Sequence, residues 1–200
     1  MVVIPTAADN ERQFTIHAYM GTHLIFDDKY KVVDFDLGYT DGCAGHDHKV
    51  AFAQLCVDHY VLIYHYCVAI SRFVHSPDYI FGMVDTTNDE KVLKTTGLAY
   101  RNLVDIQCEY NILVSEKKHK DSVVDLAMAI VDPYYIGMKD VCKNKKVAWH
   151  RAWVRRLDEY HIKYTSKDTY VSYEMSRRIV DMRKCLRRAS TNTRRHRKYR

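Results

Sequence analysis

The sequence has little that would interrupt a globular fold or cross-link one. Its 200 residues contain only 3 prolines and 7 glycines, which excludes collagen-like and linker-like chains. Its 6 cysteines form no C-x-x-C pair, and the first residues lack the basic-then-apolar pattern of a secretory signal, so we expect reduced thiols. No segment has the ~20 uninterrupted apolar residues of a bilayer span. We therefore expect a soluble protein of the nucleus, the cytoplasm or both.

Acidic residues are absent from the C-terminal end. Residues 183–200 contain nine Lys or Arg and no acid, which leaves 22 bases against 25 acids in residues 1–182. Because so polar a run cannot pack, we expect a basic disordered tail over residues 187–200. The residues expected to contact phosphate there are Arg187, Arg188, Arg194, Arg195, Arg197, Lys198 and Arg200. A nuclear address, or a solvated tail without a specific partner, explains the same composition.

The rest of the chain predicts one domain over residues 13–186, after a flexible N-terminus over residues 1–12. β-Branched and aromatic residues predict strands at 13–19 and 22–26 (a hairpin), 31–37, 50–57, 60–66, 79–84 and 103–106. Apolar periodicity predicts helices at 68–74 and 89–96, a helix that begins with a capping box at Ser122 and ends before Pro133, and two more from Trp149 onward. We therefore predict an α/β fold with a mixed central β-sheet flanked by helices.

Two aspartates in the predicted strand 31–37 are the first candidate site. Strand alternation places Asp34 and Asp36 on one face. Hard divalent cations such as Mg²⁺ prefer oxygen ligands, so clustered carboxylates near a strand end favour a metal site. An edge strand with one polar face explains the same alternation at least as well.

Two further patterns are candidates for chemistry. Tyr164 and Asp168 are four residues apart, which places a phenol and a carboxylate on one helical face, although ordinary helix decoration has the same spacing. Cys43, His46 and His48 offer zinc ligands, but no fourth ligand is evident and a glycine-containing loop explains the cluster more simply.

Taken in order, these segments resemble the DEDDy-type 3′–5′ exonucleases, and specifically the plant-type Werner-syndrome-like exonucleases. The landmarks are VAFAQLCV, YVLIYHY, the segment SPDYIFGMVDTTNDEKVLKTTGL, NLVDI, SVVDLAMAIVD and YTSKDTYVSYEMSRRIV. The resemblance implies a ribonuclease-H-like exonuclease fold in which four carboxylates hold two Mg²⁺ or Mn²⁺ ions. It also implies nucleic acid, either DNA or RNA, as the partner. Asp36, Tyr164 and Asp168 match the catalytic positions, and the two aspartates match metal ligands.

Two positions depart from the family pattern. Gly38 stands where the family has a glutamate, and Asn88 stands where the second motif has an aspartate. Asp34 and Asp89 are the available substitutes, but neither has the family's register. Because catalytic residues act as a unit, we expect metal-dependent hydrolysis from 3′ ends that is weak or lost. The alternative is a pseudo-exonuclease that binds nucleic acid or a protein.

Overall fold

The described part of the chain forms a mixed five-stranded sheet. The computed structural model describes residues 32–39, 50–58, 60–65, 73–84, 86, 100–114, 122–138 and 159–198. The strands are β1 (Val32–Tyr39), β2 (Val50–Val57), β3 (Tyr60–His65), β4 (Ile80–Met83) and β5 (Leu103–Asp105), in the order β3-β2-β1-β4-β5. β2 is antiparallel to β1 and β3, whereas β4 is parallel to β1 and β5. The predicted mixed sheet is confirmed, and the predicted hairpin over 13–26 lies outside the described residues.

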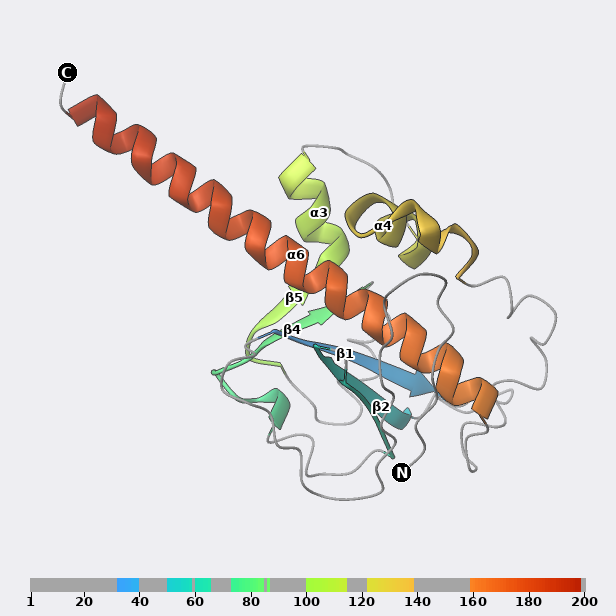
Figure 1. The fold of residues 1–200 in the computed structure, drawn as a ribbon. Helices are drawn as coiled ribbons and strands as arrows, with labels where there is room; N and C mark the ends of the chain where they lie inside the picture. Colours follow the sequence, from blue (N-terminus) through green and yellow to red (C-terminus); the bar gives the residue numbers. More distant parts are fainter. Residues whose placement is uncertain are drawn as a thin grey trace, which may run out of the picture.

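One long helix joins the sheet to the smaller helices. The helices are α3 (Ile106–Val114), α4 (Val123–Ile130), the 3₁₀ helix η1 (Pro133–Gly137) and α6 (Glu159–Lys198). Figure 1 shows α6 lying diagonally over the sheet, with α3 and α4 on its other side. None of the described helices combines the length and apolar character needed to span a membrane. The domain is therefore layered as sheet, long helix and short helices.

Strand alternation divides the core between the two faces of the sheet. Val33, Phe35 and Leu37 of β1 point to the face away from α6, where they pack with Phe81 and Leu55. The even-numbered positions of β1 point toward α6, as the packing of Val32 with Tyr173 of α6 shows. A third cluster, between α6 and the short helices, contains Ile106, Leu126, Ala127, Met138, Val171, Met175 and Ile179.

Local signals in the sequence account for where the helix α4 begins. Ser122 accepts a hydrogen bond from the Asp125 backbone N–H, and the Asp125 carboxylate accepts one from the Ser122 backbone N–H at 3.1 Å. This confirms the predicted capping box. Arg178 of α6 closes the other end of α4, because it donates to the carbonyl oxygens of Ile130 and Val131 at 2.8 and 2.7 Å.

The C-terminal end of α6 differs from the sequence prediction. A disordered tail is expected from Arg187, whereas the structure continues α6 to Lys198. Extending an existing helix needs no new nucleus, and Arg, Lys, Leu and Ala are good helix formers. The predicted helix 89–96, the helix around Trp149 and most of the helix 68–74 lie outside the described residues.

Candidate functional site

Asp36 is held in place by hydrogen bonds to both of its carboxylate oxygens. The Leu37 backbone N–H donates to Oδ1 at 2.8 Å, and Gln54 Nε2 of β2 donates to Oδ2 at 3.1 Å. β1 and β2 are paired so that Asp36 lies opposite Gln54, and alternation turns both side chains toward α6. Asp36 therefore faces the helix that carries the other predicted site residues.

Gln54 connects Asp36 to α6. The Thr169 hydroxyl donates to Gln54 Oε1 at 2.6 Å and lies 2.8 Å from the Thr165 carbonyl oxygen. Gln54 and Thr169 are both buried, so this link is shielded from water. Thr165 follows Tyr164, and Thr169 follows Asp168. Tyr164 and Asp168, the two predicted site residues, are half-buried on α6. The link therefore places the Tyr164–Asp168 turn of α6 against the strand that carries Asp36.

The position of Gly38 has no room for a side chain in this structure. Gly38 lies opposite Phe52 in the antiparallel pair of β1 and β2, and Phe52 is fully buried. A Cβ at position 38 would overlap the Phe52 ring. The backbone at Gly38 has no positive φ that would itself exclude a side chain. The space that a glutamate would need is therefore filled by an aromatic ring.

Asp34, the proposed substitute for the missing carboxylate, lies deeper under α6. It is fully buried, opposite Cys56 of β2 and Gly82 of β4. Gly82 lets α6 approach, because a Cβ there would overlap the Ser176 hydroxyl. Burial, and then the charge of Asp34, raises the pKa of the Cys56 thiol well above its ordinary value, which keeps the thiol protonated. A carboxylate enclosed in this way is poorly placed to take up an ion from solvent.

The segment after β4 is anchored by a residue that the sequence reasoning missed. Asp105, at the end of β5, accepts hydrogen bonds from the Thr86 hydroxyl at 2.8 Å and from the Cys108 backbone N–H at 2.8 Å. Asp105 therefore links Thr86, two residues before Asn88, to the first turn of α3. Asn88 and Asp89 lie outside the described residues, as do Cys43, His46 and His48.

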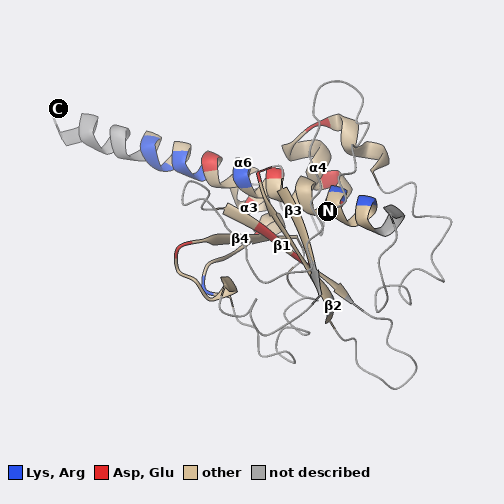
Figure 2. Ribbon diagram, turned by 60° about the horizontal axis from the view of Figure 1, so that its bottom comes forward, with Lys and Arg blue, Asp and Glu red and all other residues tan. Residues whose placement is uncertain are grey.

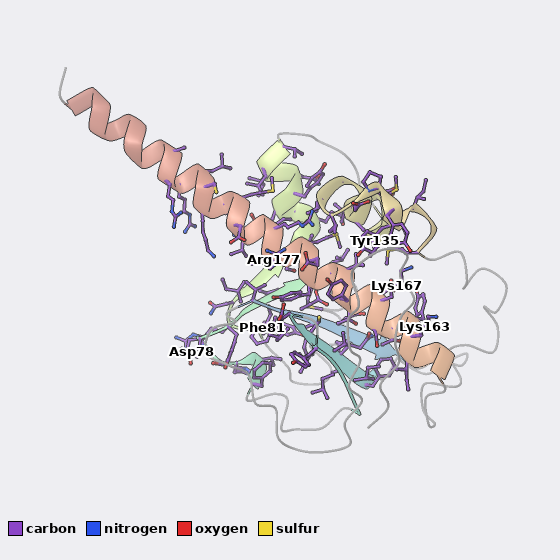
Figure 3. The ribbon with its side chains drawn as sticks, viewed as in Figure 1. Asp78, Phe81, Tyr135, Lys163, Lys167 and Arg177 are labelled. Atoms are coloured by element: carbon purple, nitrogen blue, oxygen red, sulfur yellow. The ribbon has the colours of Figure 1, made fainter. Side chains whose placement is uncertain are left out.

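The basic residues lie at both ends of α6. Lys163 precedes Tyr164, and Lys167 precedes Asp168, near the N-terminal end of the helix (Figure 3). Arg187 and Arg188 are exposed near the other end, and α6 also includes positions 194, 195, 197 and 198. Arg200 lies outside the described residues. The bases that are predicted to contact phosphate, up to Lys198, therefore lie on the same helix as the candidate site.

The described residues do not fit a two-metal centre. No group of three or more His, Cys, Asp or Glu among them is arranged to hold a metal ion. At the positions that the sequence resemblance predicts, they supply Asp36, whose two oxygens already accept hydrogen bonds, and Asp168. Gly38 supplies no ligand, and its space is occupied. Two carboxylates neutralise two dications poorly, so the donor set here is incomplete.

Neither a family model nor a curated protein sequence matches this chain. Solved structures do. The EXO domain of Aedes aegypti Nibbler has 14% identity and a TM-score of 0.57, with 80% of this chain and 82% of that chain covered. Trypanosoma brucei RNase D in a GMP complex has 12% identity and a TM-score of 0.64, with 76% and 52% covered.

A bacterial structure gives the same result. Escherichia coli RNase D has 10% identity and a TM-score of 0.58, with 79% of this chain and 41% of that chain covered. This chain therefore spans about half or less of the RNase D proteins it matches. At such identities the likeness establishes the fold. The chain has the ribonuclease-H-like fold of 3′–5′ exonuclease domains, as the sequence predicts.

Proposed function

We propose that this chain is a nucleic-acid-binding domain with the exonuclease fold whose phosphodiester hydrolysis is weak or lost. The observation that carries the proposal is the Phe52 ring over Gly38, because it removes the site of one carboxylate and blocks its simple restoration. The hydrogen bonds that Asp36 accepts from Gln54 and Leu37 favour a structural role for this carboxylate in holding β1 to α6.

Binding of nucleic acid is supported by fold and charge. One of the matched structures is Trypanosoma brucei RNase D in complex with RNA U12, with a TM-score of 0.58. The bases of α6 supply the positive charge that a phosphate backbone requires. The order of the sequence landmarks supports the plant-type Werner-syndrome-like subtype, and the solved structures above represent other members of the fold. With an incomplete donor set we expect at most one weakly held Mg²⁺ or Mn²⁺.

Binding and digestion measured on the same oligonucleotides test this proposal. The oligonucleotides are 5′-end-labelled single strands of DNA and RNA, with Mg²⁺ or Mn²⁺ at millimolar concentration and protein in excess. We expect a shift in fluorescence anisotropy and no 3′ shortening beyond that of an Asp36→Ala control. Fast 3′ shortening that Asp36→Ala abolishes would show an active exonuclease, and the absence of binding to either strand would contradict the binding function.

A further inference from the structure

The outer part of α6 extends beyond the body of the domain. α6 is 40 residues long, and Figures 1 and 2 show its C-terminal part leaving the sheet and the short helices behind. Every residue from Lys184 to Ala189 is exposed. We call the segment from Arg183 to Lys198 the basic arm. The surface of the arm from Lys184 to Ala189 is therefore available to an external partner.

Bases near the start of the basic arm make ion pairs with acidic residues. Arg177 and Lys184 pair with Asp181, at 3.9 and 3.2 Å. Arg183 pairs with Glu109 of α3 at 3.1 Å, which fixes the direction in which the arm leaves the body. After Asp181 the sequence contains no acidic residue. The sequence therefore places no acidic residue three or four positions from the bases that follow from Arg187 onward, and this part of the chain has a net positive charge.

The spacing of the bases gives the arm one charged face. Arg187 and Arg194 are seven residues apart, as are Arg188 and Arg195, and seven residues return a position to nearly the same side of a helix. Arg183, Lys184 and Lys198 continue these two rows at four-residue spacing. At 1.5 Å per residue the rows run for roughly 22 Å. The basic positions therefore lie along one side of the helix over this length.

We infer that the basic arm binds the phosphate backbone of a nucleic-acid duplex. This inference rests on the proposed nucleic-acid-binding function. A duplex presents one negative charge per ~1.7 Å of its axis, about twice the density of a single strand, and it is stiff over this length. A straight helix can follow a stiff line of phosphates without further ordering of either partner. A flexible single strand has no need of such an arm.

Two other partners fit the arm less well. The large apolar side chains exposed on the described part of the outer helix are Met182 and Leu186, which is too small an apolar face to enter a lipid surface. A second copy of the chain would bring two basic faces together. The charge therefore favours a polyanion, and a duplex is the polyanion that matches a rigid rod.

Two substitutions at Thr191 test whether the arm binds as a rigid helix or as a flexible basic tail. Thr191→Pro interrupts α6 between the two halves of the arm and keeps every charge, whereas Thr191→Ala preserves the helix. Affinity is measured for blunt DNA and RNA duplexes and for single strands over a range of salt concentrations. For Thr191→Pro we expect duplex affinity at least about tenfold weaker and a salt slope lower by about 3, from the four displaced bases.

Single strands and the Thr191→Ala variant are the controls for this experiment. We expect single-strand affinity to change by no more than about twofold in Thr191→Pro, since most of the positive charge remains. Thr191→Ala should match the unmodified chain on every probe, and circular dichroism checks that the body of each variant is folded. Equal losses on duplex and single strand, or no loss on duplex, would overturn the rigid arm. If the unmodified chain binds neither single strands nor duplexes, the proposed function and the rigid arm are both overturned.

Discussion

At the scale of single residues, a central feature of this domain is the contact between Gly38 and the Phe52 ring. The two residues are opposite each other in the antiparallel pair β1–β2, and the ring occupies the side-chain position of residue 38. A side chain there must displace a fully buried aromatic ring. The effect of a substitution at Gly38 on stability should therefore depend on the residue at position 52.

This contact makes Gly38→Ala destabilising. We expect the substitution to lower the free energy of unfolding by about 1–3 kcal/mol, because overpacking a core costs that much. In a Phe52→Val background, which lacks the ring, the same substitution should cost less than about 0.5 kcal/mol. Urea unfolding of the four proteins measures the coupling. Equal costs in the two backgrounds would show that the ring is not the obstacle.

Tyr173, which packs against the sheet from α6, provides a prediction for alkaline pH. Burial raises the pKa of its phenol to about 12, from an ordinary value of 10. The folded state therefore favours the protonated phenol, so this contribution to stability is complete below pH 10 and disappears as the pH rises through about 12. The Tyr173→Phe variant should lose less stability between these pH values than the unmodified chain. Tyr134→Phe, at an exposed tyrosine, is the control, and identical pH profiles for all three proteins would contradict this assignment.

At the scale of elements, Arg178 of α6 adds hydrogen bonds to the apolar packing between α6 and α4. Arg178 donates to two carbonyl oxygens at the C-terminal end of α4, whereas its neighbour Arg177 makes exposed ion pairs with Glu174 and Asp181. We expect Arg178→Met to cost about 1–3 kcal/mol in unfolding free energy, and Arg177→Met to cost less than about 1 kcal/mol. Thermal and urea unfolding compare the two. Equal costs would mean that the contacts of Arg178 with α4 contribute little.

Elements with a strong local signal were predictable from the sequence. β2 has the predicted bounds, β1, β3 and β4 differ from them by one or two residues, and the Ser122 capping box is confirmed. The helix α3 was missed. β5 was predicted to extend to Ile106, but Asp105 ends it by accepting a hydrogen bond from the first turn of α3. This bond depends on a backbone geometry that strand propensity does not encode.

The contacts that define the candidate site could not be predicted, because they depend on strand register. Gln54 was visible as one polar residue in an apolar strand, but its bonds to Asp36 and Thr169 require β2 to pair with β1 in one register. The Phe52 ring over Gly38 depends on the same register. The roles of Asp36, Tyr164 and Asp168 remain predictions from the family resemblance, as do those of Asn88 and Asp89.

At the scale of the whole molecule, one helix carries both ends of the proposed function. α6 begins near the candidate site, packs against the sheet and the short helices along its middle, and ends in the basic arm. The described body has the fold of 3′–5′ exonuclease domains, and the described residues contain no group of three or more side chains that could hold a metal ion. The proposed function therefore separates the binding of nucleic acid from its hydrolysis in this domain.

Gain of 3′–5′ exonuclease activity tests the loss of the carboxylate positions most directly. The variant Gly38→Glu, Phe52→Val, Asn88→Asp restores two carboxylates and makes room for the first of them. The matched control has Gly38→Gln and Phe52→Val and keeps Asn88. With end-labelled oligonucleotides and Mg²⁺ or Mn²⁺, we expect the restored variant to digest at least about 100-fold faster than the unmodified chain and the control. Asp168→Ala in that background should abolish the gain. A folded restored variant that digests no faster would contradict the account.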